Sequence, residues 1–153
     1  MLQLAGMPGA AGAVDGGPMT LRCLIVDDNP PFLAAARSLL ERQGVSVVGV
    51  ASRGAEGVRL TANLRPDVVL VDIDLGEESG LSLADRLQVE GGRPPPPVIL
   101  ISSHEEEDYA DLIAASRAIG FLPKMGLSAA AVHNLLDGRD ADRRGPVSGP
   151  PGR

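Results

Sequence analysis

Four runs of apolar residues along the chain each end in a polar side chain. In order, they are Leu24–Val26 before Asp27-Asp28, Val68–Val71 before Asp72, Val98–Ile101 before Ser102, and Gly120–Pro123 before Lys124. Such runs, rich in Val, Ile and Leu and without polar alternation, are typical of parallel strands that are buried on both faces. Ligands of open α/β sheets bind beyond the carboxyl ends of the strands, so we expect these polar side chains to share one crevice.

Segments with helical spacing of apolar residues alternate with the strands. The pattern predicts five strands, at 21–26, 45–51, 67–72, 98–102 and 120–122. It predicts helices between and after them, at 30–43, 55–64, 81–90, 105–116 and 128–136. Gly and Pro residues separate most of these segments. Five strand–helix units predict a right-handed, doubly wound parallel sheet with helices on both faces, which is an α/β fold.

The two ends of the chain lack any hydrophobic periodicity. Residues 1–19 are rich in Gly, Ala and Pro, and residues 138–153 are rich in Gly, Pro, Asp and Arg, so we expect a disordered tail at each end. One domain is expected between them, over residues 20–137. The loop at 73–80 carries Gly76 and Gly80 and is expected to bend sharply beside Asp72.

Composition narrows the possible functions. The net charge of −6 argues against nucleic-acid binding, which requires a basic stripe. No apolar stretch approaches the roughly 20 residues that cross a bilayer. The single cysteine, Cys23, lies in the first predicted strand and is expected to be a buried thiol, which is consistent with a cytoplasmic location. The protein is therefore expected to bind neither nucleic acid nor a membrane.

The residues expected in the crevice suit phosphoryl chemistry. Three carboxylates, from Asp27, Asp28 and Asp72, would repel one another unless a cation lay between them, and oxygen ligands suit Mg²⁺. Lys124 is the only lysine in the chain, and its compact ammonium suits a phosphate oxygen. The Ser102 hydroxyl could donate a hydrogen bond to a second phosphoryl oxygen, and one carboxylate could attack the phosphorus.

Together these motifs resemble the receiver domain of two-component response regulators, the CheY-like fold, over about residues 20–137. The resemblance is carried by Leu24-Ile25-Val26-Asp27-Asp28, Val71-Asp72-Ile73-Asp74-Leu75 with Gly80, Leu100-Ile101-Ser102-Ser103-His104, and Gly120-Phe121-Leu122-Pro123-Lys124. Within that family the chain looks most similar to NarL/FixJ-type receivers. The resemblance implies a five-stranded, flavodoxin-like sheet with strand order 2-1-3-4-5.

The resemblance also implies a role for each site residue. Asp72 would be the phosphoacceptor, and Mg²⁺ would be held by Asp27, Asp28, Asp72 and the main-chain carbonyl of Asp74. Lys124 would bind the phosphoryl group, Ser102 would be the switch hydroxyl, and Phe121 would be the aromatic rotamer switch.

The function expected from this resemblance is that of a stand-alone response regulator rather than an enzyme. Its phosphoryl donor would be a sensor histidine kinase or a histidine phosphotransfer protein, and its output would be a changed surface read by an unidentified downstream protein. A phosphorylation-dependent homodimer is left open. About seventeen residues follow Leu136, too few for the DNA-binding domain that NarL/FixJ-type receivers usually precede. The chain also departs from the family at Gly76 and Met125, where Pro is common, and Gly76 is expected to make the Asp72 loop more mobile.

Three alternatives were weighed. The first is an atypical receiver that serves as a phosphorylation-independent interaction module. The second is a phosphatase of the haloacid dehalogenase type, because Asp72-Ile73-Asp74 fits a nucleophile-x-acid motif. In those enzymes, however, that motif ends the first strand. The third is an FMN-binding flavodoxin relative, whose cofactor phosphate Asp27 and Asp28 would repel.

Overall fold

The computed structural model describes residues 20–104 and 106–148. The predicted N-terminal tail, residues 1–19, lies outside the described residues, as do Glu105 and residues 149–153 of the predicted C-terminal tail. The main strands are β3 (Arg22–Val26), β4 (Ser46–Ala51), β5 (Val68–Asp72), β8 (Val98–Ser102) and β9 (Gly120–Pro123). The α-helices are α1 (Pro30–Arg42), α2 (Gly54–Leu64), α3 (Gly80–Glu90), α4 (Ala110–Ala115) and α5 (Ala129–Ser148).

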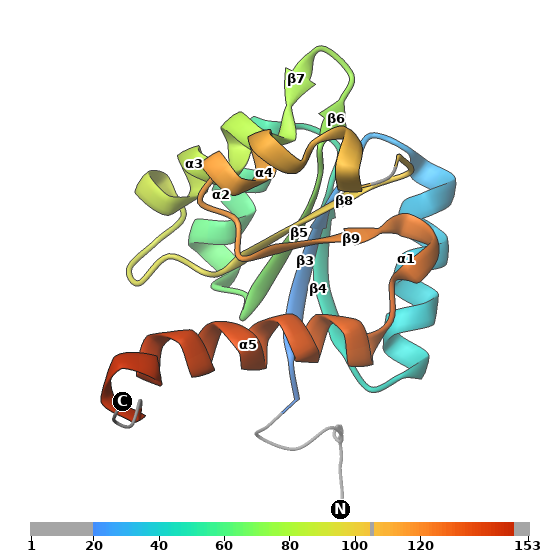
Figure 1. Ribbon diagram of the computed structural model, residues 1–153. Coiled ribbons are helices and arrows are strands. Elements are labelled where there is room, and N and C mark those ends of the chain that lie inside the picture. The colour runs from blue at the N-terminus through green and yellow to red at the C-terminus, as the bar shows by residue number, and fades with distance from the viewer. Residues whose placement is uncertain (1–19, 105, 149–153) are drawn as a thin grey trace, which may run out of the picture.

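The five main strands form one parallel sheet in the order β4-β3-β5-β8-β9. In chain order this is 2-1-3-4-5, so the predicted sheet is confirmed. The strands lie side by side at the centre of the molecule with helices around them (Figure 1). In the register of the central pair, Asp72 is aligned with Ile101, so that β5 and β8 end at nearly the same level. The predicted crevice therefore lies at this edge of the sheet.

Alternate strand residues point to opposite faces and build two aliphatic cores. On one face Leu24 and Val71 belong to a cluster that α2 and α3 cover with Val58 and Leu87. On the other face, the strands pack against α1 and α5, whose buried residues include Leu40 and Val132. Because both faces of the sheet are covered, the strand residues of β5 and β8 are all buried. This explains why the sequence shows continuous apolar runs rather than alternation.

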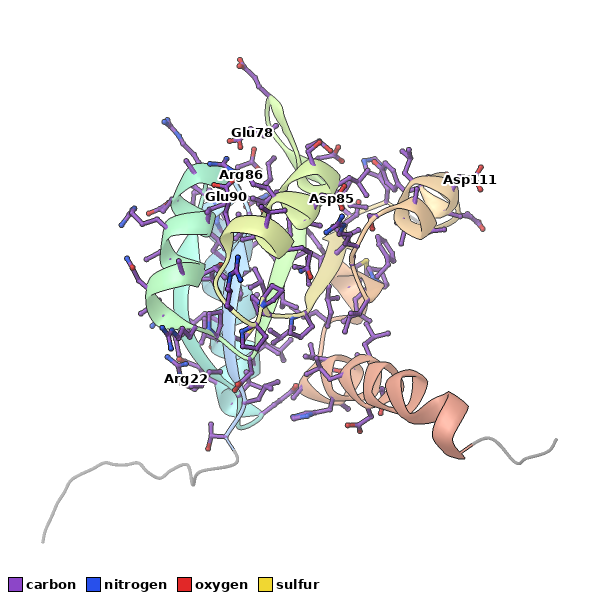
Figure 2. The ribbon with its side chains drawn as sticks, turned by 90° about the vertical axis from the view of Figure 1, so that its left-hand side faces the viewer. Arg22, Glu78, Asp85, Arg86, Glu90 and Asp111 are labelled. Atoms are coloured by element: carbon purple, nitrogen blue, oxygen red, sulfur yellow. The ribbon has the colours of Figure 1, made fainter. Side chains whose placement is uncertain are left out.

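The loop after Asp72 is more ordered than the sequence indicated. It forms a small antiparallel ribbon of β6 (Asp74–Leu75) and β7 (Glu78–Ser79). The intervening Gly76 has a φ of 65°, the left-handed conformation that glycine adopts most readily at such turns. The Glu78 carboxylate accepts hydrogen bonds from the Gly54 N–H at 3.2 and 3.3 Å and so ties the ribbon to the start of α2. Figure 2 shows Glu78 beside this ribbon, above α2.

Two helix boundaries differ from the predictions. The expected helix at 105–116 is replaced by a 3₁₀ turn at Glu106–Asp108, called η1, and the six-residue α4, which buries none of its residues. Ile113 is the α4 residue that packs, partly buried, against the core cluster, and so narrow a contact does little to sustain a longer helix. The last helix was expected to end at Leu136, but α5 continues to Ser148. Each added residue other than Pro146 brings a backbone N–H that can extend a nucleated helix, so the loss of apolar periodicity does not by itself end it.

Among the described residues, no helix combines the length and apolar character needed to cross a bilayer.

Candidate functional site

The predicted site residues come from the carboxyl ends of four strands. Asp27 directly follows β3, Asp72 is the last residue of β5, and Ser102 is the last residue of β8. Lys124 follows β9 and begins η2 (Lys124–Gly126), a 3₁₀ turn. The structure brings Asp27, Asp72 and Lys124 into direct contact although 97 residues separate the first from the last in sequence number.

The Lys124 ammonium bridges the two buried carboxylates. Its Nζ lies 2.7 Å from Asp27 Oδ2 and 3.1 Å from Asp72 Oδ2. The Asp27 side chain is fully buried, and those of Asp72 and Lys124 are 7% and 14% exposed. Asp27 Oδ2 receives no hydrogen bond of good geometry from the described residues, so the attraction of opposite charges at 2.7 Å is its main compensation for burial.

Main-chain N–H groups hold the other carboxylate oxygens. Asp27 Oδ1 accepts a hydrogen bond from the Asn29 N–H at 2.9 Å, and Asp72 Oδ1 accepts one from the Asp74 N–H at 3.0 Å. Asn29 in turn caps α1, because its side-chain oxygen accepts a hydrogen bond from the Phe32 N–H. The orientation of both carboxylates is therefore fixed by the first residues of the loops that follow their strands.

The local electrostatics make the ionised form of Asp72 less favourable than that of an exposed aspartate. Burial raises the pKa of Asp72 to about 6; the Asp74 N–H lowers it, nearby Asp27 raises it, and Lys124 lowers it. For Lys124, burial works against the charge, but the close contact with Asp27 and the charges of both carboxylates outweigh it and raise the pKa. One lysine charge thus does not fully compensate the buried acidic pair.

The donor set fits Mg²⁺. Carboxylate oxygens of Asp27, Asp28 and Asp72 lie within 4.8 Å of one another. Asp28 is exposed at the rim, whereas the other two are buried. Mg²⁺ prefers hard oxygen ligands and keeps several waters, which an open rim allows. Asp74, the fourth predicted ligand through its carbonyl, is placed at this rim by the hydrogen bond between its N–H and Asp72.

The two predicted switch residues are buried. Ser102 is fully buried, and its hydroxyl accepts a hydrogen bond from the His104 N–H at 3.0 Å. Phe121 is 7% exposed and belongs to the core cluster that includes Leu100. The resemblance implies that Phe121 is an aromatic rotamer switch, and its ring is buried in the core in this structure. The switching role of both residues remains a prediction.

Sequence reasoning missed three contacts made by aromatic rings at the site. The Tyr109 hydroxyl donates a hydrogen bond to Asp74 Oδ2 at 3.2 Å, and the His104 ring meets the Tyr109 ring edge-on at a centroid distance of 6.0 Å. On the other side, the Lys124 Nζ lies 4.4 Å from the centroid of the Phe32 ring. The chain has only three Phe, Tyr and Trp residues, and two of them, Phe32 and Tyr109, make these contacts. This scarcity was the one available signal for them in the sequence.

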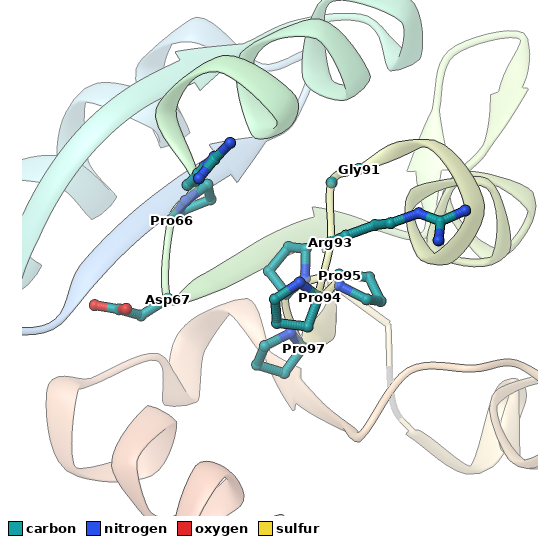
Figure 3. Close-up of a pocket in the computed structure, with 10 residues that line it drawn as sticks. Pro66, Asp67, Gly91, Arg93, Pro94, Pro95 and Pro97 are labelled. Atoms are coloured by element: carbon teal, nitrogen blue, oxygen red, sulfur yellow. The ribbon is translucent and has the colours of Figure 1, made fainter.

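Two of the hollows among the described residues lie near the ends of the sheet strands, outside this charged cluster. One, of about 470 Å³, opens beside Asp28 and is lined by Arg53, Glu77 and Glu78 among others. The other, of about 390 Å³, lies at the opposite edge of the sheet, before the starts of β5 and β8. Figure 3 shows Pro94, Pro95 and Pro97, from the segment before β8, gathered beside Pro66 and Asp67 in this second hollow. The second hollow shares no residue with the cluster of Asp27, Asp72 and Lys124.

Replacing Asp72 by Asn should stabilise the metal-free protein in a pH-dependent way. The folded-state pKa of about 6 exceeds the ordinary value of 3.8, so between about pH 4 and 6 the folded state holds more protons than the unfolded state. Wild-type stability therefore falls as the pH rises through this window. The full pKa shift would correspond to about 3 kcal/mol of unfolding free energy. Screening by solvent at the rim reduces the expected gain of Asp72→Asn to on the order of 1 kcal/mol above pH 6.

Thermal melts in a chelating buffer at pH 4 and pH 7 measure this difference in stability. They compare wild type with Asp72→Asn and Asp28→Asn. Added Mg²⁺ should raise the melting temperature of wild type more than that of either variant, because each variant lacks one ligand oxygen charge. Equal Mg²⁺ shifts in the three proteins would show that these carboxylates do not form one cation site.

Comparison with known proteins identifies domains with a similar sequence and fold. The family model described as "Response regulator receiver domain" matches residues 23–135, which is most of the chain. The chain is similar to a signal receiver domain from Mycobacterium tuberculosis whose protein is described as the response regulator NarL. The two are 30% identical, with a TM-score of 0.68 over 78% of this chain and 96% of that one. A LuxR-family two-component response regulator from Aurantimonas is 26% identical, with a TM-score of 0.69 over 78% and 86% of the two chains.

Curated relatives match through part of their length. A protein-glutamate methylesterase/protein-glutamine glutaminase of Alkalilimnicola ehrlichii is 34% identical over 107 residues, which make up 69% of this chain and 27% of the relative. The DNA-binding transcriptional activator EvgA of Escherichia coli is 28% identical over 68 residues, 44% of this chain and 33% of the relative. The chain thus spans about a third or less of these relatives.

Proposed function

Because the chain belongs to the response regulator receiver domain family, we propose that it accepts a phosphoryl group on Asp72. The donor is a phosphohistidine of a sensor histidine kinase or of a histidine phosphotransfer protein. A carboxylate oxygen of Asp72 attacks the phosphorus, and the phosphorus–nitrogen bond of the donor breaks. The imidazole nitrogen keeps the bonding electron pair, and water later hydrolyses the resulting acyl phosphate.

The observation that carries this proposal is the Lys124 bridge between Asp27 and Asp72. A phosphoryl group on Asp72 adds negative charge where three carboxylates already converge, so transfer needs nearby positive charge. The Lys124 ammonium, 3.1 Å from Asp72 Oδ2, is within reach of an oxygen carried by that carboxylate. The Asp74 N–H holds the other Asp72 oxygen and so fixes the direction of attack.

The second requirement is a divalent cation. Asp27, Asp28 and Asp72, with the Asp74 carbonyl, would hold Mg²⁺, which supplies charge neutralisation for the phosphoryl oxygens. This chain's own contribution is to present these oxygens at an open rim, while Lys124 balances part of their charge from the other side.

Intact-mass spectrometry tests the proposal. The full chain, incubated with phosphoramidate and Mg²⁺, should gain the mass of one phosphoryl group, and a chelator should prevent the gain. Hydroxylamine should release the group, because it cleaves acyl phosphates. A chain that gains no mass under these conditions would remove the proposed function.

The output is a changed surface around α4, β9 and α5, read by a downstream protein. Ser102 and the segment after it connect the site to α4, because the Tyr109 that precedes this helix bonds to Asp74. A hydrogen bond donated by the Ser102 hydroxyl to the phosphoryl group would draw Ser102 toward Asp72 and move this segment. Because Phe121 is already buried, the proposal assigns the first movement to Ser102.

Replacing Ser102 by Ala should separate phosphorylation from output. The variant keeps Asp72, the carboxylates and Lys124, so it should still take up one phosphoryl group, but it loses the bond that moves the segment. Amide hydrogen exchange with and without a beryllofluoride mimic measures the response. Wild type should change across residues 103–125, and the variant should not. The same exchange changes in both proteins would refute the assigned switch.

The alternatives from the sequence make different predictions. An interaction module without phosphorylation would gain no mass from phosphoramidate. A haloacid dehalogenase-type phosphatase is not retained, because the family match extends over residues 23–135 and the Asp72-Ile73-Asp74 motif ends the third strand of the chain.

A further inference from the structure

The Phe32 ring is the third group that contacts the Lys124 ammonium. Two carboxylate oxygens, from Asp27 and Asp72, lie 2.7 and 3.1 Å from Nζ, and the centroid of the Phe32 ring lies at 4.4 Å. The face of an aromatic ring attracts a cation within about 6 Å, and the attraction grows as water is excluded. With its side chain 14% exposed, Lys124 is largely desolvated. The contact is therefore expected to be stronger than that of a fully exposed lysine.

The ring is held in place from two directions. Phe32 lies in the first turn of α1, whose cap residue Asn29 accepts a hydrogen bond from the Phe32 N–H at 3.1 Å. The Asn29 N–H donates to Asp27 Oδ1 at 2.9 Å. The Phe32 side chain also packs against the core cluster that contains Leu40. A closed circuit of contacts thus runs from Asp27 through Asn29, Phe32 and Lys124 back to Asp27.

This circuit restricts the position of the Lys124 ammonium more than the two carboxylates can do alone. A lysine side chain is flexible, and its ammonium makes a point-charge contact without directional constraint. The fully buried Asp27, at 2.7 Å, is the nearer of its two carboxylate partners. A rigid apolar face on another side limits where the ammonium can move and excludes water from it. The Phe32 ring can therefore keep Lys124 beside Asp72 while the charge on Asp72 changes.

We propose that Phe32 is a positioning residue for Lys124, holding its ammonium at the point where the oxygens of a phosphoryl group on Asp72 arrive. The effect on phosphorylation rate rests on the proposed function, whereas the contact between Phe32 and Lys124 does not. Replacing Phe32 by Leu keeps an apolar side chain and removes the ring face. Phosphorylation by phosphoramidate should then slow about three- to tenfold, the range that a partly desolvated cation–π contact supports.

The sole lysine gives the test a direct spectroscopic readout. In the full chain with ¹³C-labelled lysine, the ε-methylene resonances belong to Lys124 alone. The Phe32 ring should shift them upfield in wild type. The shift should disappear in Phe32→Leu and be retained in Phe32→Tyr, which keeps the ring face. Phe32→Tyr should also restore the phosphorylation rate.

Leu33→Ala is the matched control. Leu33 is the next residue of α1, partly buried against the same core cluster, so its truncation weakens packing without touching Lys124. This variant should melt at a lower temperature but keep the wild-type ε-methylene shift and the wild-type rate. The inference is overturned if Phe32→Leu leaves the shift unchanged, or if Leu33→Ala slows phosphorylation as much as Phe32→Leu does. If wild type takes up no phosphate, the proposed function fails, while the shift still decides whether Phe32 positions Lys124.

Discussion

Replacing Asp72 by Asn should abolish phosphoryl uptake while leaving the protein folded. An amide has no anionic oxygen to attack phosphorus, so intact-mass spectrometry after incubation with phosphoramidate and Mg²⁺ should show no gain for this variant. Loss of folding would not account for the result, because removing the Asp72 charge is expected to stabilise the metal-free protein. The expected effect is the complete loss of a product that wild type forms.

An exposed carboxylate on α4, Asp111, provides the control. It lies well away from the sheet edge that carries the site, as Figure 2 shows, and Asp111→Asn should take up one phosphoryl group as wild type does. Peptide mapping of the wild-type product locates the modification independently. Phosphate found on Asp74 or on Asp28, or a normal mass gain in Asp72→Asn, would show that the acceptor was assigned to the wrong carboxylate.

Replacing Gly80 by Ala should destabilise the protein by about 2 to 3 kcal/mol, because an added methyl group would meet backbone that cannot easily move. A Cβ built on Gly80 overlaps the carbonyl of Asp72 and lies against the Ile73 backbone. The Gly80 N–H also donates to the Ile73 carbonyl at 2.7 Å, so the start of α3 is pressed directly against the end of β5. Relief of the overlap must displace Asp72 or the first turn of α3.

Calorimetry or circular dichroism would measure this as a melting temperature lower by roughly 6 to 12 °C. Because Asp72 is displaced, phosphoryl uptake should also slow. Gly138→Ala is the matched control: it lies in α5 with no atom within 4 Å of an added Cβ, so the change should be neutral or stabilising by up to about 1 kcal/mol. Equal melting temperatures for Gly80→Ala and wild type would mean that the backbone around Gly80 and Asp72 can move apart at little cost.

Part of this structure could be predicted from short segments of the sequence. The apolar run before Asp72 identified β5, because a strand covered by helices on both faces needs apolar residues at every position. The same reasoning found the strands before Asp27, Ser102 and Lys124. Parallel strands end at a common edge, so the side chains that follow them were expected to be neighbours, and the contacts of Lys124 with Asp27 and Asp72 agree with that expectation. The sheet order came from the family resemblance.

Other features depend on contacts between distant segments and left no local signal. The Phe32–Lys124 contact joins α1 to η2, the Tyr109–Asp74 bond joins the segment before α4 to the ribbon after β5, and Glu78 caps the start of α2. Each depends on where helices lie on the sheet and which way a side chain turns, which hydrophobic periodicity does not specify. The predicted helix ends were wrong for a related reason. The length of a helix such as α5 depends on backbone cooperativity and packing rather than on the apolar pattern. The sequence by itself therefore determined the strands and the residues at their ends, whereas the tertiary structure alone decided which groups hold those residues in place.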